Sequence, residues 1–354
     1  MSLDVRSALS TYDPPVVTQL VTQPRGGRPA KSAGTVGVLR YDAARREELF
    51  LSMTKADREA LLSSWIKPSS DSEKEQQDRA ERMVRDAINA WPAFEDVSLA
   101  IYTKGSYPNN TNVRADSDVD VVVECLECFY FDYAHGVTGN PGVGSRYEGG
   151  WTKERWREEV GNALIKAFGE DDIDLTGKVA QNVAAVKGSR PSADVVPSFN
   201  YYRYLDGGRN SYYNGSCVFD TSGKKIVNWP DQQFKNGRKK NTDTGKSYKR
   251  FVRALKRCEN KLVGLGRLDE LPSYFMECLV WNVANPTLCI GDDLQSGFRA
   301  TLVELWGALE DGSAEANWKE PNELKWLFKG DKKWSVDDGT NLVLETWRFL
   351  EYGS

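Results

Sequence analysis

The strongest constraint on the fold is a pair of acids at the start of an apolar segment. Asp118 and Asp120 stand two residues apart, and apart from Asp120 the segment 119–123 is all valine. On a β-strand, side chains two positions apart point to the same face. The two carboxylates therefore lie side by side, while Val119 and Val121 enter a core behind them. Because adjacent carboxylates repel each other, this segment predicts a strand with a cation site on its open face.

A third acid, Asp194, lies in a second short apolar strand, 193–196, which we expect Pro197 to end. An unpaired acid in such a strand is destabilising, so Asp194 is expected to share the site of Asp118 and Asp120. Oxygen ligands of this kind suit Mg²⁺, which normally also takes phosphates and water. Three acids carried by strands around one point are typical of a two-metal phosphoryl-transfer centre, with ions about 3.5–4 Å apart.

A glycine turn and a basic segment add two candidate phosphate contacts. Gly105 lets the backbone approach a phosphate closely, and Ser106 adds a hydroxyl donor. The segment 235–261 carries eleven Lys and Arg against two acids, a local net charge of +9 that suits a polyphosphate. A solvated helix face is the simpler reading for any single one of Arg250, Arg253, Lys256 and Arg257, and a basic face also suits RNA.

The order of elements predicts an α+β lobe followed by a helical lobe. Proline and glycine are frequent in residues 1–52, which we interpret as an N-terminal arm. Apolar residues recur every three or four positions along 71–91, a long amphipathic helix suited to lie across a sheet. Strand patterns follow, with the glycine-rich stretch 129–150 as a flexible insertion, and the chain becomes mainly helical from residue 247.

Composition excludes several other classes of protein. The chain has 47 basic and 51 acidic residues, so it is not a polycation built to coat nucleic acid. Its one histidine, His135, makes a Ser-His-Asp hydrolase improbable. No apolar run is long enough to span a bilayer, and six scattered cysteines are typical of reduced thiols. We therefore expect a cytoplasmic protein with no membrane partner.

Three segments together resemble the DNA polymerase β-type nucleotidyltransferase superfamily. They are Gly105-Ser106-Tyr107, Asp116-Ser117-Asp118-Val119-Asp120 and Ala193-Asp194-Val195-Val196-Pro197. Within that superfamily the chain is similar to the bacterial CD-NTases, the cGAS/DncV-like nucleotidyltransferases of CBASS antiphage systems. The resemblance implies a small mixed sheet with a long spanning helix, plus a C-terminal helical lobe. The implied domains are the arm 1–52, a catalytic core 53–215 and a helical lobe 216–354 that completes the nucleotide cleft.

The resemblance also implies an activity: template-independent synthesis of a cyclic di- or oligonucleotide second messenger from NTPs, with release of pyrophosphate, in antiphage defence. It implies purine NTPs, ATP and GTP, as substrates and a separate effector protein that responds to the product. Two Mg²⁺ ions, for which Mn²⁺ can substitute, would be held by Asp118, Asp120 and Asp194. A nucleic-acid activator is not indicated, because the chain has no zinc-ribbon insertion like that of the animal DNA sensor.

Residues outside the acids receive implied roles as well. By resemblance, Lys249 contacts the donor triphosphate, Ser273 donates to the phosphates and Tyr274 stacks on the base. From the residues alone, Ser273 after Pro272 is also a candidate helix N-cap. The alternatives are another polymerase β-type enzyme, which makes linear oligoadenylate or adds tails to RNA, and a catalytically silent nucleotide or RNA sensor. The intact set of three acids argues against the silent sensor.

Overall fold

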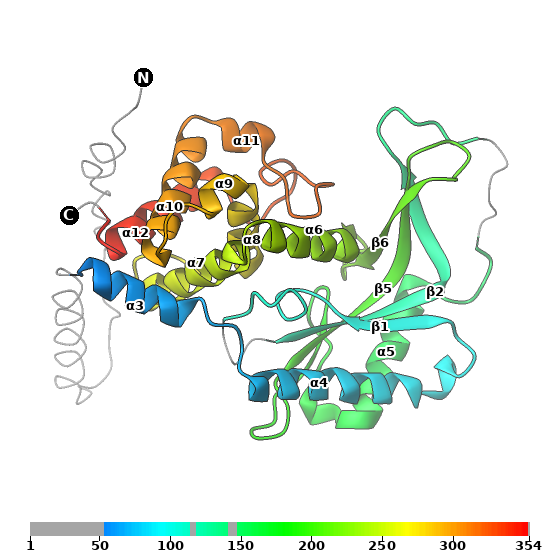
Figure 1. Ribbon diagram of the computed structural model, residues 1–354. Helices are drawn as coiled ribbons and strands as arrows, with labels where there is room; N and C mark the ends of the chain where they lie inside the picture. Colours follow the sequence, from blue (N-terminus) through cyan, green and yellow to red (C-terminus); the bar gives the residue numbers. More distant parts are fainter. Residues whose placement is uncertain (1–52, 114–117, 141–146, 353–354) are drawn as a thin grey trace, which may run out of the picture. The chain divides into compact units, whose positions relative to one another are not determined.

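The computed structural model describes residues 53–113, 118–140 and 147–352, so the predicted arm 1–52 lies outside the described residues. The chain divides into two compact units, which are described separately here (Figure 1). The sheet unit comprises 67–249 and 319–327, and the helical unit comprises the remaining described residues. This division differs from a boundary at residue 215, because the last strands and the helix after them stay with the sheet.

The sheet unit is built on a mixed sheet with seven strands in its described part, in the order β1-β2-β5-β4-β3, with β6 paired to β5 and β7 to β6. Strands β2 and β5 run parallel and the other pairs antiparallel. The strands are β1 (Leu99–Thr103), β2 (Val119–Tyr133), β3 (Ile173–Asp174), β4 (Gln181–Val183), β5 (Ala193–Tyr204), β6 (Tyr212–Phe219) and β7 (Lys225–Asn228).

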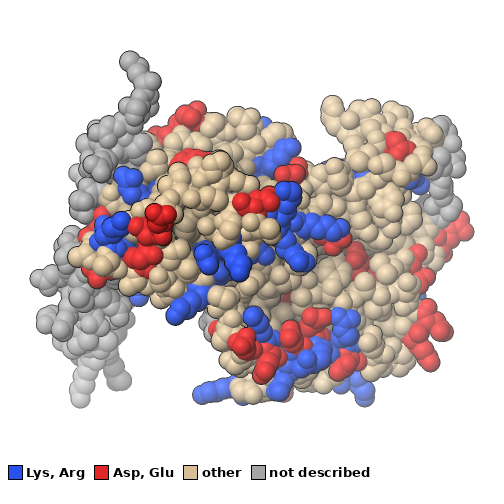
Figure 2. Space-filling model, viewed as in Figure 1, with Lys and Arg blue, Asp and Glu red and all other residues tan. Residues whose placement is uncertain are grey.

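Two helices, α4 (Asp71–Asn89) and α5 (Lys153–Phe168), cover the same face of the sheet (Figure 1). The predicted helix at 71–91 is confirmed, with a capping box at Ser70 and a buried apolar stripe. That stripe and α5 pack on Val119, Val121 and Val195, which are fully buried. The outer face of α4 carries charges of both signs (Figure 2). The acids of β2 and β5 are thereby left on the opposite face of the sheet.

Two strands are longer than the sequence predicts, since the pattern ends the first at Cys125 and the second before Pro197. Strand β2 continues through Tyr133 into the stretch that was predicted to be a flexible insertion, after a register shift between Cys125 and Phe129. Strand β5 continues through Pro197 to Tyr204. Pro197 lies between the part of β5 that pairs with β4 and the part that pairs with β6. On that edge a missing N–H breaks no ladder, so proline is tolerated there.

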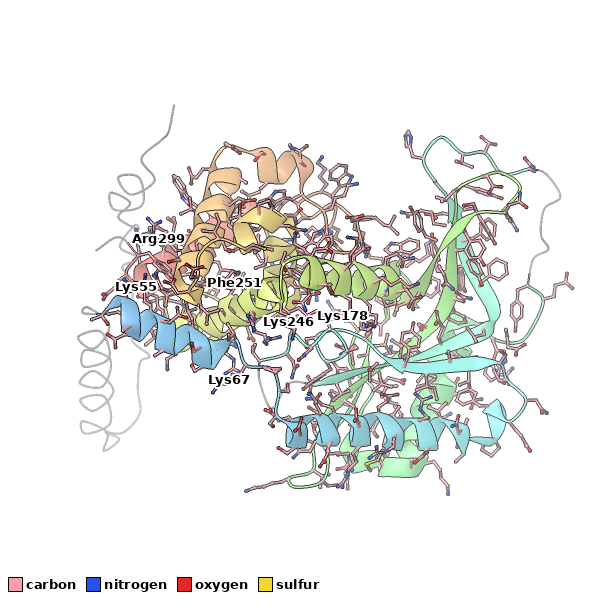
Figure 3. All side chains as sticks on the ribbon, viewed as in Figure 1. Lys55, Lys67, Lys178, Lys246, Phe251 and Arg299 are labelled. Atoms are coloured by element: carbon pink, nitrogen blue, oxygen red, sulfur yellow. The ribbon has the colours of Figure 1, made fainter. Side chains whose placement is uncertain are left out.

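The rest of the described chain is mainly helical, as predicted from residue 247 onward. Helix α6 (Pro230–Asp243) belongs to the sheet unit, and Lys246 lies in the turn after it (Figure 3). Phe251 of the next helix packs on Phe298 in the helical unit, with ring centroids 5.6 Å apart. The remaining helices are α3 (Lys55–Trp65), α7 (Ser247–Gly264), α8 (Ser273–Asn282), α9 (Asn285–Leu288), α10 (Leu294–Glu310), α11 (Ser313–Asn317) and α12 (Val336–Phe349), with 3₁₀ turns at Pro92–Phe94 and Glu170–Asp172.

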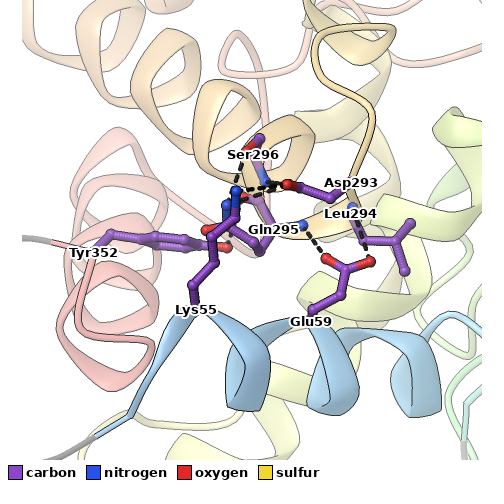
Figure 4. A network of polar contacts seen from close by, with 7 residues as sticks. All are labelled: Lys55, Glu59, Asp293, Leu294, Gln295, Ser296 and Tyr352. Atoms are coloured by element: carbon purple, nitrogen blue, oxygen red, sulfur yellow. Dashed lines mark hydrogen bonds and ion pairs between the residues drawn. The ribbon is translucent and has the colours of Figure 1, made fainter.

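The N-terminus of α10 is the polar centre of the helical unit (Figure 4). Asp293 caps the helix by accepting from Ser296 N, and it pairs with Lys55 of α3 at 2.8 Å. Glu59 of α3 accepts from Leu294 N and Gln295 N, at 3.1 and 2.9 Å. Because the first N–H groups of a helix lack partners within it, these carboxylates fasten α3 to α10.

No helix within residues 53–113, 118–140 and 147–352 is both long and apolar enough to cross a bilayer.

Candidate active site

The glycine turn after β1 lies directly against one of the acids. Gly105 has φ +80°, a left-handed conformation that favours glycine, and a Cβ built on it would lie 2.5 Å from Asp120 Oδ2. The turn is fixed by Asn109 Nδ2, which donates to Gly105 O at 2.9 Å, and by Thr111 N, which donates to Ser106 O at 2.9 Å. The backbone at Gly105 is therefore held beside the Asp120 carboxylate.

The register of the sheet brings two of the three acids together. Strands β2 and β5 pair in parallel with Asp120 opposite Asp194. Neighbouring strands lie about 4.8 Å apart, so the two side chains start from adjacent points on the same face. Asn182 of β4 stands opposite Asp194 and donates its Nδ2 to Asp194 Oδ1 at 2.9 Å.

The third predicted acid is placed at the entrance to the same strand. Asp118 precedes β2 by one residue and is exposed, and its Oδ1 accepts a hydrogen bond from Ser192 Oγ. Val119 N donates to Ser192 O at 2.9 Å, which ties the starts of β2 and β5 together. Asp118 and Asp120 thus flank a buried valine, as the sequence pattern predicts.

The charges of these groups act on one another. Burial raises the pKa of Asp120, the ammonium of Lys104 lowers it, and the charges of Asp194 and Asp118 raise it again. Burial lowers the pKa of Lys104, while Asp120 and Asp194 act in the opposite direction. The three carboxylates are therefore close enough to repel, and Lys104 is a cation within their field.

Carboxylate oxygens in mutual repulsion fit a divalent cation, which would relieve that repulsion. The hard oxygen donors of Asp118, Asp120 and Asp194 are the types that Mg²⁺ prefers. As their side chains are placed, the described residues contain no group of three or more His, Cys, Asp or Glu positioned as a complete metal site. The donor chemistry suits the ion, and the assignment of these three acids as its ligands stays a prediction.

The other predicted nucleotide contacts are not brought together within one unit. Lys249 is buried near the start of α7, at the edge of the sheet unit, and its N donates to Asn241 Oδ1 at 3.2 Å. Ser273 and Tyr274 belong to the helical unit. Ser273 is the first residue of α8 and is exposed, so it is not the N-cap, which is Pro272. The ring of Tyr274 lies 6.4 Å from that of Trp334.

The basic segment is not simply a solvated face. Arg253 and Lys256 are 6% and 2% exposed. Arg253 Nε donates to Ile66 O at 2.7 Å, and burial lowers the pKa of Lys256 while Glu277 of α8 raises it. These cations are structural groups inside the helical unit. The interpretation of them as solvated was therefore wrong.

Two residues next to the acids were not singled out from the sequence: Lys104 and Asn182. Lys104 directly precedes Gly105, and its N–H donates to Asp120 O at 3.0 Å. Asn182 lies in β4, at a position that no motif marks. Their proximity to the acids depends on strand register, which the sequence pattern does not specify.

A second buried acid lies on the same face of the sheet, farther along β2. Glu124 is 7% exposed and stands opposite Ser198 of β5. Burial raises the pKa of Glu124 to about 7, hydrogen bonding by Tyr102 lowers it, and the charge of Asp231 raises it. Glu124 Oε1 and Ser198 Oγ have no hydrogen-bond partner among the described residues. Glu124 is therefore held largely neutral below pH 7.

We expect Glu124→Gln to be more stable than the parent protein above pH 7. The carboxyl binds its proton more tightly in the folded state than at its ordinary pKa of 4.5, so folding stability falls as the pH rises from about 4.5 through about 7. The glutamine removes that loss, which amounts to at most about 3 kcal/mol. Urea unfolding at pH 5, 6, 7 and 8 measures it.

The exposed Glu158 of α5 provides a matched control, because Glu158→Gln changes an acid in water. Parallel stability curves for the parent protein and Glu124→Gln from pH 5 to 8 would show that the buried carboxyl is ionised throughout.

Comparison with known proteins gives a family match in the C-terminal part of the chain. The family described as "cGAS/DncV-like nucleotidyltransferase C-terminal helical domain" matches residues 235–351. Two curated relatives are each named "Cyclic dipyrimidine nucleotide synthase CdnE". The one from Cecembia lonarensis is 32% identical over 83% of this chain and 98% of the relative. The one from Legionella pneumophila is 33% identical, with the same coverage of both chains.

A solved structure extends the likeness to three dimensions. The CdnE cyclic dinucleotide synthase of Elizabethkingia meningoseptica, determined with GTP and Apcpp, superposes with a TM-score of 0.69 and 27% identity. The match covers 83% of this chain and 99% of that one. The predicted α+β fold with a helical C-terminal lobe is thereby confirmed.

Proposed function

Because this chain belongs to the CdnE family of cGAS/DncV-like nucleotidyltransferases, the cyclic nucleotide synthases of bacterial CBASS systems, we propose that Asp118, Asp120 and Asp194 are its catalytic acids. The observation that carries the proposal is the pairing of Asp120 with Asp194 on adjacent parallel strands, with Gly105 against the Asp120 carboxylate. This places two carboxylates and a backbone turn that can approach a phosphate on one face of the sheet.

Enzymes of this family generally use divalent metal ions, and the three acids are the proposed ligands here. When bound, such cations neutralise charge on the phosphoryl oxygens and favour ionisation of the attacking hydroxyl. The protein's own contribution is positioning. The Gly105 turn admits a triphosphate, Ser106 offers a hydroxyl donor, and Asn182 fixes the orientation of Asp194. In the proposed assignment Lys249 and Ser273 bind donor phosphates, and Tyr274 stacks on a base.

The reaction needs no protein nucleophile. A ribose hydroxyl of one nucleotide loses its proton to solvent and attacks the α-phosphorus of the other. A new P–O bond forms, the bond from that phosphorus to the bridging oxygen breaks, and pyrophosphate leaves. A second transfer of the same kind closes the ring, so each cyclic dinucleotide releases two pyrophosphates. Asp120 and Asp194 take part in both transfers, because the strands hold them in one place.

The substrates are NTPs, and we propose that pyrimidines are among them. Both curated relatives described above are named as dipyrimidine synthases, so the prediction of purine substrates finds no support from them. The product would act on a separate effector protein. A cytoplasmic location suits the chain's cysteines, all six of which are described and are free thiols.

Incubation of the full chain with each NTP alone and with every pair of NTPs, in Mg²⁺ or Mn²⁺, tests this proposal. Mass spectrometry is expected to find a product with the mass of a cyclic dinucleotide that contains UMP or CMP. Because a ring has no terminal phosphate, the product should resist phosphatase. Pyrophosphate release measured in parallel should give two equivalents for each product.

Other products would point to other functions. A phosphatase-sensitive ladder or a lengthened RNA would indicate a linear polymerase. Nucleotide binding without turnover in either metal would indicate a silent sensor. A purine-only ring would keep the synthase and overturn the choice of base.

A further inference from the structure

Four polar residues form a row on the face of the sheet opposite α4 and α5; three lie in β2, β5 and β4, and the fourth directly follows β1. Asp120 stands opposite Asp194, and Asp194 stands opposite Asn182. On the other side of Asp120, β1 pairs with β2 up to Thr103 opposite Val121, and Lys104 N donates to Asp120 O at the next position. The row is therefore Lys104, Asp120, Asp194 and Asn182, which we call the polar row.

Residues directly opposite one another on neighbouring strands have Cβ atoms about 5 Å apart and share a face of the sheet. The flanking side chains of β2, Val119 and Val121, are buried on the other face against the helices. The polar row thus has an apolar layer behind it. Its two acids lie in the middle, with a lysine at one end of the row and an amide at the other. If a strand turned so that its polar residue faced the helices, its valines would leave the core, so each residue is fixed to this face.

Each end of the polar row acts on the acids in a different way. Asn182 Nδ2 donates to Asp194 Oδ1 at 2.9 Å, which fixes one oxygen of that carboxylate. Lys104 is partly buried, and its ammonium interacts electrostatically with both Asp120 and Asp194. Its backbone is held beside Asp120 at the end of β1, so its side chain starts from a fixed position next to the acids.

We propose that Lys104 is a positioning residue of the metal site, whose ammonium holds the Asp120 and Asp194 carboxylates in place before divalent cations arrive and weakens the binding of those cations by repulsion. The inference rests on the proposed function, since it takes these acids as the metal ligands. The site is then preformed without metal, at the expense of metal affinity. Removing the charge should tighten metal binding, whereas keeping it in another side chain should not.

The test is a Mn²⁺ titration of the full chain without nucleotide, in which free Mn²⁺ is read by electron paramagnetic resonance. Lys104→Met and Lys104→Gln are each expected to bind Mn²⁺ about tenfold more tightly than the parent protein, because one like charge has left the site. Lys104→Arg keeps the charge and should stay within about twofold of the parent. In pyrophosphate release, the half-saturating Mn²⁺ concentration should fall for the two neutral variants in the same proportion.

Two further variants separate this proposal from the proposed function. Lys166→Met removes an exposed lysine from α5, on the other face of the sheet, and should leave Mn²⁺ affinity unchanged. Asp120→Asn should weaken Mn²⁺ binding. Should it bind Mn²⁺ as the parent does, the metal ligands are misassigned and the proposed function fails at its site.

A different result would overturn the role of Lys104 and keep the proposed metal ligands. In that result, Asp120→Asn loses Mn²⁺ while the neutral Lys104 variants bind it no more tightly than the parent. An unchanged Mn²⁺ affinity with a raised KM for NTP would instead make Lys104 a contact of the triphosphate. Melting temperatures of all variants accompany the titrations, and the glutamine, which keeps a polar group, covers the case in which the methionine variant does not fold.

Discussion

Asp120→Asn is expected to lower the rate of pyrophosphate release by about a thousandfold or more, because it removes the charge of a proposed metal ligand at the centre of the site. The same change should not lower the melting temperature. Burial and the charges of Asp194 and Asp118 raise the pKa of Asp120 by more than the ammonium of Lys104 lowers it, so the ionised carboxylate costs folding free energy that a neutral asparagine does not. Activity and thermal unfolding, measured on the same preparation, show the two effects together.

The exposed Asp96, in the turn before β1, supplies a matched control. Asp96→Asn removes the same charge from the sheet unit and should retain the parent's rate. If Asp120→Asn kept more than about a tenth of the parent's activity across Mg²⁺ and Mn²⁺, the acid would be outside the reaction centre.

Gly105→Ala should reduce turnover by about a hundredfold, the second largest effect that the structure predicts. The added Cβ would lie 2.5 Å from Asp120 Oδ2, so the carboxylate has to move. An alanine at φ +80° also costs about 1 kcal/mol of stability. The loss of turnover should exceed what that modest loss of folding stability explains.

Gly136 separates the two contributions, since it has the same φ of +80° and nothing within 4 Å of a built Cβ. Gly136→Ala therefore carries the backbone strain without the contact. We expect the two alanine variants to melt at similar temperatures and to differ widely in kcat. Equal kcat values would mean that the turn at Gly105 does not control the position of the acid.

The side-chain pattern of single strands could be predicted from the sequence. The alternation around Val119 places Asp118 and Asp120 on the face away from the core, and the structure agrees. What could not be predicted is which residues stand opposite one another. Lys104 and Asn182 join the acids only through the pairing of β1 with β2 and of β4 with β5, and no motif in the sequence marks the register of these pairs.

Composition misled the prediction at the end of β2 and along α7. The glycines after Phe129 indicated a flexible insertion, yet aromatic residues at alternate positions carry β2 on to Tyr133. Likewise, the basic character of α7 suggested a solvated face, while burial of Lys256 depends on Glu277 in another helix. Charge alone does not reveal whether a remote segment supplies a counter-charge.

The spacing of Asp120 and Asp194 has a consequence for ring closure. The two acids hang from hydrogen-bonded neighbouring strands, so the gap between their backbones is the repeat distance of a β-sheet and cannot widen unless the sheet itself comes apart. Between formation of the first and the second phosphodiester bond, the linear intermediate must therefore reorient within the site. The two acids keep the same spacing in both transfers. The groups that hold the bases therefore determine which cyclic product forms.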